Sequence, residues 1–262
     1  MDLGLTGRRF MVVGAGGIAS AVCASLAGEA VGGLALGVRD LARGQDLLAR
    51  LPRPVGTTVV LPCELDARFD AGACLDAAED AVGPLDGLVM CAGDPAWGDL
   101  WEVSDRDWDA ALGSMLLGSV RMVRALLPRL CERGWGRVVL VGGLNGRKPA
   151  GGSVIAGVVC AGLASVATAV AKQAIVHDVT VNVVDPHLTQ TPRWHRQVRR
   201  LEDRAGISTE DAEGRLLAEI PRGRPVRPDE VADTITFLLS DRASSIAGSA
   251  VAVDGAVAPG LY

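Results

Sequence analysis

Asp185 and His187 together offer acid/base chemistry in this chain. An imidazole exchanges protons readily near pH 7, and a carboxylate two residues away can orient it or act separately. Side chains two residues apart on a strand share a face only while the backbone stays extended. The alternatives are that His187 merely fills space and that Asp185 caps a turn. Ser153, at the start of an apolar helical stretch, is a third candidate for the site.

A glycine-rich turn occupies residues 14–19, which read Gly-Ala-Gly-Gly-Ile-Ala. It fits the pattern G-x-G-x-x-G/A after an apolar run and at the start of a helical stretch. Gly14, Gly16 and Gly17 allow a tight turn and close approach of a pyrophosphate. The helix start, including Ile18, supplies free N–H groups to bind that pyrophosphate. The alternative is a tight turn that binds no ligand.

The end of the second apolar run indicates which dinucleotide would bind. NAD sites carry an acidic residue at this strand tip, where it accepts hydrogen bonds from the ribose 2′-hydroxyl. Here Val38 takes that place, and Arg39 and Asp40 follow. A guanidinium can bind a 2′-phosphate bidentately, which favours NADP(H) over NAD(H). The alternatives are that Arg39 is a solvated charge and that no cofactor binds.

Short apolar runs that alternate with helical segments would position these residues. The runs are 10–13, 33–38, 57–61, 85–91, 137–141, 179–184 and 250–253. The alternation predicts an α/β fold, a Rossmann-type doubly wound parallel sheet of about seven strands with helices on both faces. We expect a single domain over residues 1–262.

The composition limits the class of partner. Hydrophobic residues make up 49% of the chain, and the net charge of -5 argues against a nucleic acid or an anionic membrane. The six cysteines show no C-x-x-C pair and no metal-ligand spacing, so we expect reduced thiols, no metal site and a cytoplasmic location. The uncharged stretch 154–171 is long enough to span a membrane, but its place in the β/α alternation predicts a buried or interface helix.

These motifs resemble the short-chain dehydrogenase/reductase family over nearly the whole chain. The segment 182–191 matches the family's N-x-V-x-P-G-x-x-x-T, with His187 in place of the glycine. The glycine loop is one residue shorter than the family's and resembles that of shikimate-dehydrogenase-like domains. The resemblance implies that residues of about 192–227 form a lid-like insertion over the substrate cleft. It also implies cofactor contacts at Glu64, Leu65, Cys91, Ala92, Gly93, Pro186, Thr189 and Thr191.

The family's catalytic Asn, Ser, Tyr and Lys are all replaced in this chain. The matching positions hold, in that order, Met115, Gly143, Ala156 and Cys160. The only tyrosine is Tyr262, so no shift of register supplies another within the domain. The resemblance leaves open that Tyr262 approaches the cleft of a neighbouring subunit. Loss of the acid alone removes about 10²–10⁴ in rate, so ordinary carbonyl reduction is not expected.

Three functions stay open on this sequence. We favour a non-standard family member that binds NADP(H) and acts on a small carbonyl-type substrate by a displaced or non-redox acid/base mechanism. The second is an NADP-dependent oxidoreductase with a rearranged proton donor. The third is a non-catalytic subunit that pairs with an active homologue. The helices expected at 105–131 and 153–171 suit the dimer interface common in the family, so we expect a homodimer or homotetramer.

Overall fold

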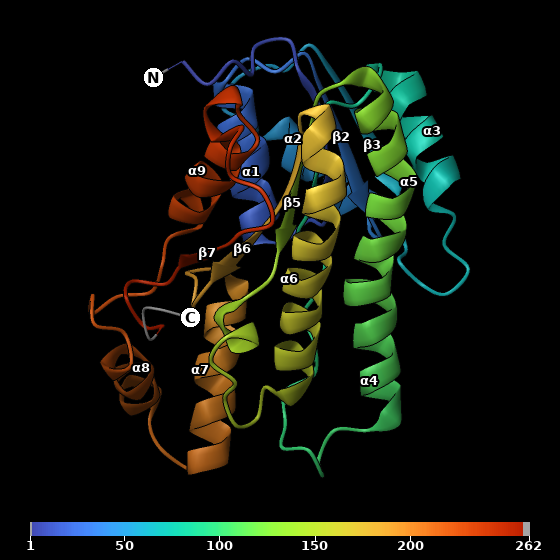
Figure 1. The fold of residues 1–262 in the computed structure, drawn as a ribbon. Helices are drawn as coiled ribbons and strands as arrows, with labels where there is room; N and C mark the ends of the chain where they lie inside the picture. The colour runs from blue at the N-terminus through green and yellow to red at the C-terminus, as the bar shows by residue number, and fades with distance from the viewer. Residues whose placement is uncertain (1, 259–262) are drawn as a thin grey trace.

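The computed structural model describes residues 2–258, which fold around a 7-stranded parallel sheet of order β3-β2-β1-β4-β5-β6-β7 (Figure 1). The strands are β1 (Arg9–Val13), β2 (Gly33–Val38), β3 (Thr57–Pro62), β4 (Gly87–Met90), β5 (Gly136–Val141), β6 (Val179–Pro186) and β7 (Ala250–Val253). The predicted fold class is therefore confirmed. The strand order reverses between β1 and β4, the place where such sheets bind ligands.

The strand limits differ from the prediction in two places that concern the site. β4 is shorter than the apolar run 85–91, so Cys91 lies beyond its carboxyl end. β6 is longer than expected and includes Asp185 and Pro186, because these residues pair with Ala252 and Val253 of β7. His187 is therefore the first residue after the strand.

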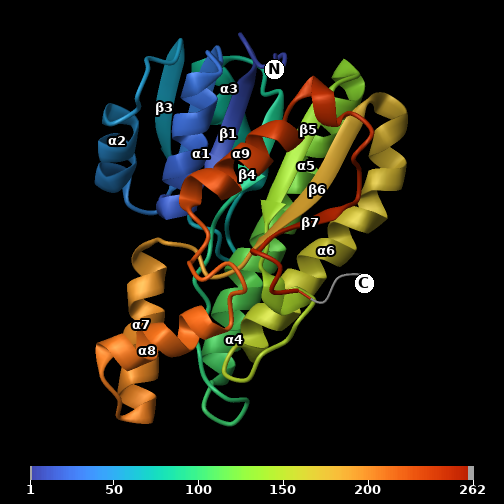
Figure 2. The ribbon, with the colours of Figure 1, turned by 90° about the vertical axis from the view of Figure 1, so that its left-hand side faces the viewer.

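Helices cover both faces of the sheet (Figures 1 and 2). One face carries α3 (Ala71–Val82), α5 (Gly118–Arg133) and α6 (Val154–Ala174), and the other carries α1 (Gly17–Gly28), α2 (Leu41–Ala49) and α9 (Pro228–Leu238). Leu140 and Val183 lie in the core beneath α6, whereas Val139 and Val184 lie in the core beneath α9. Since the strands are buried on both faces, they read as continuous apolar runs.

Two helical stretches, 105–133 and 154–177, are long and apolar enough to cross a membrane by length and composition alone. Both pack on the sheet: Leu126 of α5 and Leu163 of α6 are buried in the same core. The outer side of α6 stays open, and Val158 there is 46% exposed. α6 is thus a sheet-covering helix with one uncovered face.

The long interruption between β6 and β7 contains α7 (Pro192–Ala205) and α8 (Thr209–Ala218) ahead of α9. Both ribbon views place α7 and α8 beyond the carboxyl ends of the strands, below the layers of the sheet (Figures 1 and 2). This is the segment predicted as a lid over the cleft, and that role stays a prediction.

Candidate functional site

The glycine loop joins β1 to α1 at the point where the strand order reverses. Gly14 has a φ of 121°, and a Cβ there would lie 3.0 Å from the carbonyl oxygen of Cys91, so this approach of β1 to β4 requires glycine. α1 begins at Gly17 with no side-chain cap from Gly16 and no acidic residue in its first turn. The first N–H groups of α1, including that of Ile18, therefore remain open to an anion.

The segment after β6 lies directly on this loop. A Cβ on Gly17 would lie 2.6 Å from Cγ2 of Thr191. Thr191 is the N-cap of α7, where its Oγ1 accepts a hydrogen bond from the Arg193 N–H at 3.3 Å. Gly17 and Thr191, each predicted as a cofactor contact, are thus brought together.

The residues predicted for the adenosine end fall into two groups. Arg39 is exposed and forms no ion pair within residues 2–258, and Glu64 is also exposed. Asp40 instead caps α2, with its Oδ1 accepting the Arg43 N–H at 3.1 Å. Leu65 is buried against Gly118, so its side chain faces the core and only its backbone can meet a ligand. The Arg39 guanidinium has no ion-pair partner within residues 2–258, and its contact with a 2′-phosphate stays a prediction.

Met115 fills the space beside the loop after β4. Gly93, which follows Ala92, has a φ of 132°, and a Cβ there would lie 2.3 Å from Cγ of Met115. Met115 belongs to a π-helical turn, η1 (Leu112–Leu117), between α4 (Asp105–Ala111) and α5. Its carbonyl accepts a hydrogen bond of 2.6 Å from the Ser119 hydroxyl. Such turns are rare and often mark functional sites. Here the turn presents an apolar side chain, that of Met115.

Gly143, Ala156 and Cys160 lie together between β5 and α6. A Cβ on Gly143 would lie 3.5 Å from the Sγ of Cys160, and Ala156 precedes Cys160 by one turn. Burial, with a smaller contribution from the Asp185 carboxylate, raises the pKa of the Cys160 thiol to about 12. The thiol is therefore protonated at neutral pH, and none of these three residues titrates near pH 7.

Asp185 supports the turn after β5. Its carboxylate is buried and accepts hydrogen bonds from the Gly143 N–H at 3.0 Å and from Arg147 Nε at 3.3 Å. Burial raises the pKa of this carboxyl, although the Gly143 N–H and the Arg147 charge oppose that rise. These bonds match the turn-capping alternative, and no hydrogen bond joins Asp185 to His187 in the described part of the chain.

His187 is half-buried, and its Nδ1 is a buried atom with no hydrogen-bond partner within residues 2–258. Burial lowers the pKa of the imidazole; Asp254 opposes this effect and Lys148 adds to it. The ring is therefore neutral at pH 7, with one nitrogen uncommitted. Of these two charged neighbours, Asp254 directly follows β7 and Lys148 lies in the segment after β5. A catalytic role for His187 stays a prediction.

The remaining predicted residues make local backbone and turn contacts. Ser153 precedes α6 without a capping hydrogen bond from its side chain, and its backbone pairs with that of Gly98. Pro186 is buried at the end of β6. The Thr189 hydroxyl donates to the His187 carbonyl at 2.8 Å. Their roles toward a ligand stay predictions, and Tyr262 lies outside the described residues.

The sequence analysis missed the ion pairs that border the site. One joins Arg147 to Asp185, and another set joins Asp94 to Arg193 at 3.4 Å and to Arg196 at 2.5 Å. Asp94 directly follows Gly93, and the rule that residues beyond strand carboxyl ends line the cleft could have found it. No local pattern links it to arginines on a helix about a hundred residues later.

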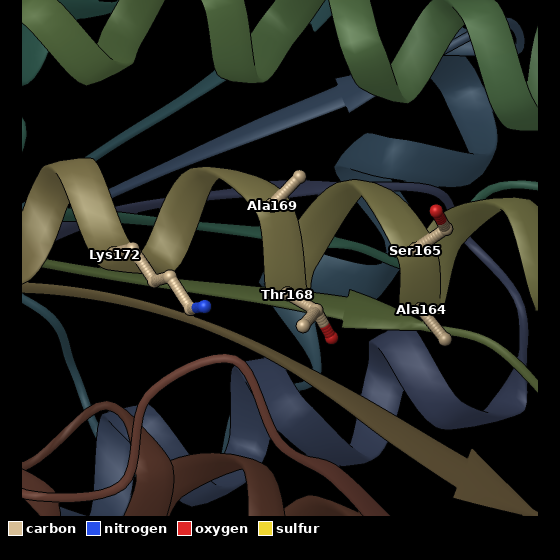
Figure 3. Close-up of a pocket in the computed structure, with 5 residues that line it drawn as sticks. All are labelled: Ala164, Ser165, Thr168, Ala169 and Lys172. Atoms are coloured by element: carbon tan, nitrogen blue, oxygen red, sulfur yellow. The ribbon is translucent and has the colours of Figure 1, made fainter.

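A separate hollow lies on α6. It has a volume of about 480 Å³ and is lined by Ala164, Ser165, Thr168, Ala169 and Lys172. Figure 3 shows these side chains along the length of the helix. Since a helix rises about 1.5 Å per residue, this hollow begins about 12 Å along the axis from Ala156. It is therefore distinct from the Gly143–Cys160 region. Among residues 2–258, no group of three or more His, Cys, Asp or Glu could hold a metal ion.

Comparison with known proteins agrees with this geometry. Residues 13–257 match the family model adh_short_C2, described as enoyl-(acyl carrier protein) reductase. The chain is 30% identical to a putative ketoacyl reductase of Streptomyces coelicolor over 198 residues, 74% of this chain and 75% of the relative. It is 27% identical to 3-oxoacyl-[acyl-carrier-protein] reductase FabG of Escherichia coli over 98% of both chains.

Solved structures show the same architecture. A crystal structure of a variant actinorhodin polyketide ketoreductase with NADPH superposes with a TM-score of 0.91 at 26% identity, covering 96% of this chain and 97% of that one. A 3-oxoacyl (acyl-carrier-protein) reductase from Agrobacterium tumefaciens with NADP bound gives 0.87 at 25% identity, covering 97% and 95%. The chain therefore belongs to the short-chain dehydrogenase/reductase family, a family of oxidoreductases.

Proposed function

We propose that this protein is a non-standard member of its family that binds NADP(H) and acts on a small carbonyl-type substrate by acid/base chemistry without the family's tyrosine. One contrast carries the proposal. The α1 N-terminus and Arg39 remain free for a phosphorylated ligand, whereas Met115, Gly143, Ala156 and Cys160 supply no proton donor near pH 7.

The residues present fit the adenosine and pyrophosphate part of NADP(H). The pyrophosphate would lie on the first N–H groups of α1, at Gly17 and Ile18, where no capping or acidic side chain competes and Thr191 packs against Gly17. Arg39 would hold the 2′-phosphate. Two relatives of known structure carry NADPH or NADP. When bound, the nicotinamide would supply hydride chemistry. Cys160, at the position of the family's catalytic lysine, cannot replace that lysine in holding the nicotinamide ribose.

His187 is the residue that we propose as the acid/base. Its neutral ring has an uncommitted Nδ1 at the carboxyl end of β6, within the segment 182–191, which in the family lines the nicotinamide end. Deprotonation beside a carbonyl, as in isomerisation, dehydration or lyase chemistry, requires one such base. Asp185 is bonded to Gly143 and Arg147 and would position the turn.

A second candidate is NADP-dependent reduction with a rearranged proton donor. It is favoured by the names of the relatives, which are ketoacyl and acetoacetyl-CoA reductases. The same cleft would serve both chemistries, and a small carbonyl compound would be the substrate in either case.

The third candidate is a non-catalytic subunit paired with an active homologue. Leu117 and Val158, each 46% exposed, leave apolar surface on the helices that would form a dimer. The same surface supports a homodimer or homotetramer.

We also propose that the protein is located in the cytoplasm.

Calorimetric titration with NADPH and NADH tests the cofactor. We expect NADPH to bind more tightly, and Arg39→Ala to weaken NADPH by about ten- to a hundredfold, as loss of a hydrogen-bonded charge does. Arg43→Ala is the matched control, because Arg43 is an exposed arginine one turn into α2 whose backbone serves the cap. If neither nucleotide binds, or if Arg43→Ala weakens NADPH equally, the cofactor proposal is wrong.

The chemistry is tested with acetoacetyl-CoA in D₂O, with and without NADPH. Deuterium exchange at the α-carbon without oxidation of NADPH supports acid/base chemistry, and His187→Asn should abolish it. Oxidation of NADPH that survives His187→Asn supports the reductase candidate. If neither reaction exceeds the buffer rate for this or other carbonyl compounds, the non-catalytic candidate stands.

A further inference from the structure

Two of the six cysteines lie together at the carboxyl edge of the sheet, in the half that we propose for the nucleotide. Cys63 is the first residue after β3, and its backbone N–H donates to the Val38 carbonyl at 2.8 Å. Cys74 lies one turn into α3, and its backbone N–H donates to the Asp70 carbonyl at 3.1 Å. Both cysteines are buried in the same core, with exposed fractions of 3% and 8%. The fold therefore brings two thiols from separate elements into one place.

The two thiols share a hydrogen bond, which raises the pKa of Cys63 and lowers the pKa of Cys74. Burial adds to the rise at Cys63 and opposes the fall at Cys74. In contrast, burial raises the pKa of Cys23 and of Cys160 to about 12. Since the thiolate is the nucleophile of cysteine chemistry, Cys74 is the member of the pair that can attack an oxidant.

The surroundings of the pair leave room for a disulfide bond. A Cβ on Gly37 of β2 would lie 3.3 Å from the Sγ of Cys63, so the glycine leaves this sulfur without a side chain pressed against it. A disulfide brings two sulfurs to about 2.0 Å, and thiols that share a hydrogen bond need only a small approach to form one.

The pair also lies beside a surface loop. Glu64, directly after Cys63, is exposed, and so is Asp70 at the start of α3. Cys74 keeps 8% of its surface exposed, whereas Cys23 in α1 keeps none. A molecule as small as hydrogen peroxide therefore reaches Cys74 more readily than Cys23.

We propose that Cys63 and Cys74 form a redox pair that a peroxide oxidises to a reversible disulfide. The Cys74 sulfur attacks one oxygen of hydrogen peroxide. An S–O bond forms, the O–O bond breaks, and the hydroxide that leaves takes up the proton that Cys74 lost and becomes water. The Cys63 sulfur then attacks the sulfur of the Cys74 sulfenic acid, an S–S bond forms, and the hydroxyl group leaves as water with the proton of Cys63. Two thiols are thus oxidised by two electrons, and one peroxide is reduced to two molecules of water.

The disulfide would act on the adenosine end of the nucleotide site, a consequence that rests on the proposed function. Cys63 directly precedes Glu64 and Leu65, which the family resemblance assigns to the cofactor. It is also hydrogen-bonded to Val38, the residue before Arg39. A bond that draws Cys63 toward α3 would displace both segments, so we expect the oxidised protein to bind NADPH more weakly.

Peroxide treatment of the folded, reduced chain tests the pair. After hydrogen peroxide is removed, the remaining thiols are blocked with N-ethylmaleimide in urea and the chain is digested with trypsin. Trypsin cleaves after Arg68, between the two cysteines, so their disulfide links two separate peptides. Mass spectrometry should show these linked peptides before any oxidation of Cys23 or Cys160, and dithiothreitol should separate them. Oxidation without this link, or a link from either cysteine to a third one instead, would overturn the proposal.

Serine variants test the order of attack. Cys63→Ser should leave Cys74 as a sulfenic acid that dimedone labels, whereas Cys74→Ser should leave Cys63 unlabelled. Cys131→Ser is the matched control, because Cys131 is a partly exposed cysteine of α5 outside the pair, and it should leave the link unchanged. Equal labelling of Cys63 and Cys74 would contradict the assigned roles. The link in the wild-type chain decides the proposal even where a variant fails to fold.

Titration of the two redox states with NADPH tests the consequence for the cofactor. We expect a loss of affinity on oxidation that dithiothreitol restores. Equal affinity in the two states would overturn the connection between the pair and the nucleotide site. If neither state binds NADPH, the proposed function fails, whereas the mapped disulfide still decides whether Cys63 and Cys74 form a redox pair.

Discussion

The two halves of the sheet differ in what lies beside the carboxyl ends of their strands. In the half built from β1 to β3, the glycine loop, the uncapped α1 and the free Arg39 leave an open place for a nucleotide. In the half built from β4 to β6, side chains fill the corresponding place. Met115 lies against Gly93, and Cys160 lies beside Gly143.

The π-helical turn at Met115 and the close approach at Gly143 shape this half, and none of the side chains of Met115, Ala156 and Cys160 titrates near pH 7. A fold specifies where chemistry can occur, whereas individual side chains decide which chemistry occurs. Four predictions test how closed the second half is.

The largest effect is expected at Cys160. With a pKa of about 12 instead of 9.0, its thiolate fraction at pH 8 is about a thousandfold below that of an ordinary thiol. Alkylation by iodoacetamide, followed by mass spectrometry, should therefore modify the partly exposed Cys131 long before Cys160. Cys23, buried with a pKa of about 12 as well, is the matched control in the other half. Rapid labelling of Cys160 alone would mean that the second half is open and reactive.

Gly93→Ala should be the most destabilising substitution of this set. Its Cβ would meet Met115 at 2.3 Å, and its φ of 132° is unfavourable for alanine. Overpacking and strain together cost about 2–4 kcal/mol of unfolding free energy, measured by urea denaturation. Gly134→Ala separates the two causes, because Gly134 has a φ of 71° and no atom within 4 Å of its Cβ position. It should cost about 1 kcal/mol.

If both alanine variants lose the same amount, Met115 can move aside and the second half is less tightly filled than the coordinates indicate. Met115→Ala in the Gly93→Ala background should recover the packing part of the loss and leave the backbone part. A complete recovery would contradict the contribution of φ.

The sequence predicted the features that depend on local pattern. The lengths of the apolar runs and their alternation with helical segments predicted the strands, and the spacing of the glycines predicted the turn at Gly14 to Gly17. These patterns can be recognised because they belong to consecutive residues. The family resemblance located Met115, Gly143, Ala156 and Cys160. The structure brings Gly143 and Cys160 together and places Met115 against Gly93. Leu65 is buried against Gly118, and its contact with a cofactor stays a prediction.

The features that the sequence did not predict depend on distant contacts. Asp185 bonds to Gly143 and Arg147, about 40 residues earlier, rather than to His187. The ion pairs of Arg196 with Asp94 and of Arg204 with Glu102 join segments about a hundred residues apart. Long side chains reach such partners only once the fold has brought the elements together, so no spacing in the sequence reports them.

Asp185→Ala should cost about 1–3 kcal/mol, because it leaves the partly buried Gly143 N–H without a partner. Asp185→Asn keeps an acceptor and should cost less. Since burial raises the pKa of Asp185 above 3.8, the folded protein holds this proton more tightly than the unfolded chain. Wild type should therefore lose stability relative to Asp185→Asn as the pH rises above about 4. Urea melts between pH 4 and 7 measure the difference; a constant difference would show that Arg147 fully offsets the burial.

The smallest effect is expected at His187. Burial lowers its folded-state pKa below 6.5, so the unfolded chain binds this proton more readily. The contribution of His187 to the free energy of unfolding is then present above pH 6.5 and is lost as the pH falls below that value. This contribution changes by at most about 1.4 kcal/mol per pH unit. His187→Asn should flatten the unfolding free energy between pH 5 and 6.5, and His177→Asn controls for the loss of one histidine. A slope that survives His187→Asn would mean that solvent already reaches the ring in the folded state. The imidazole would then be an exposed histidine at the rim of the second half.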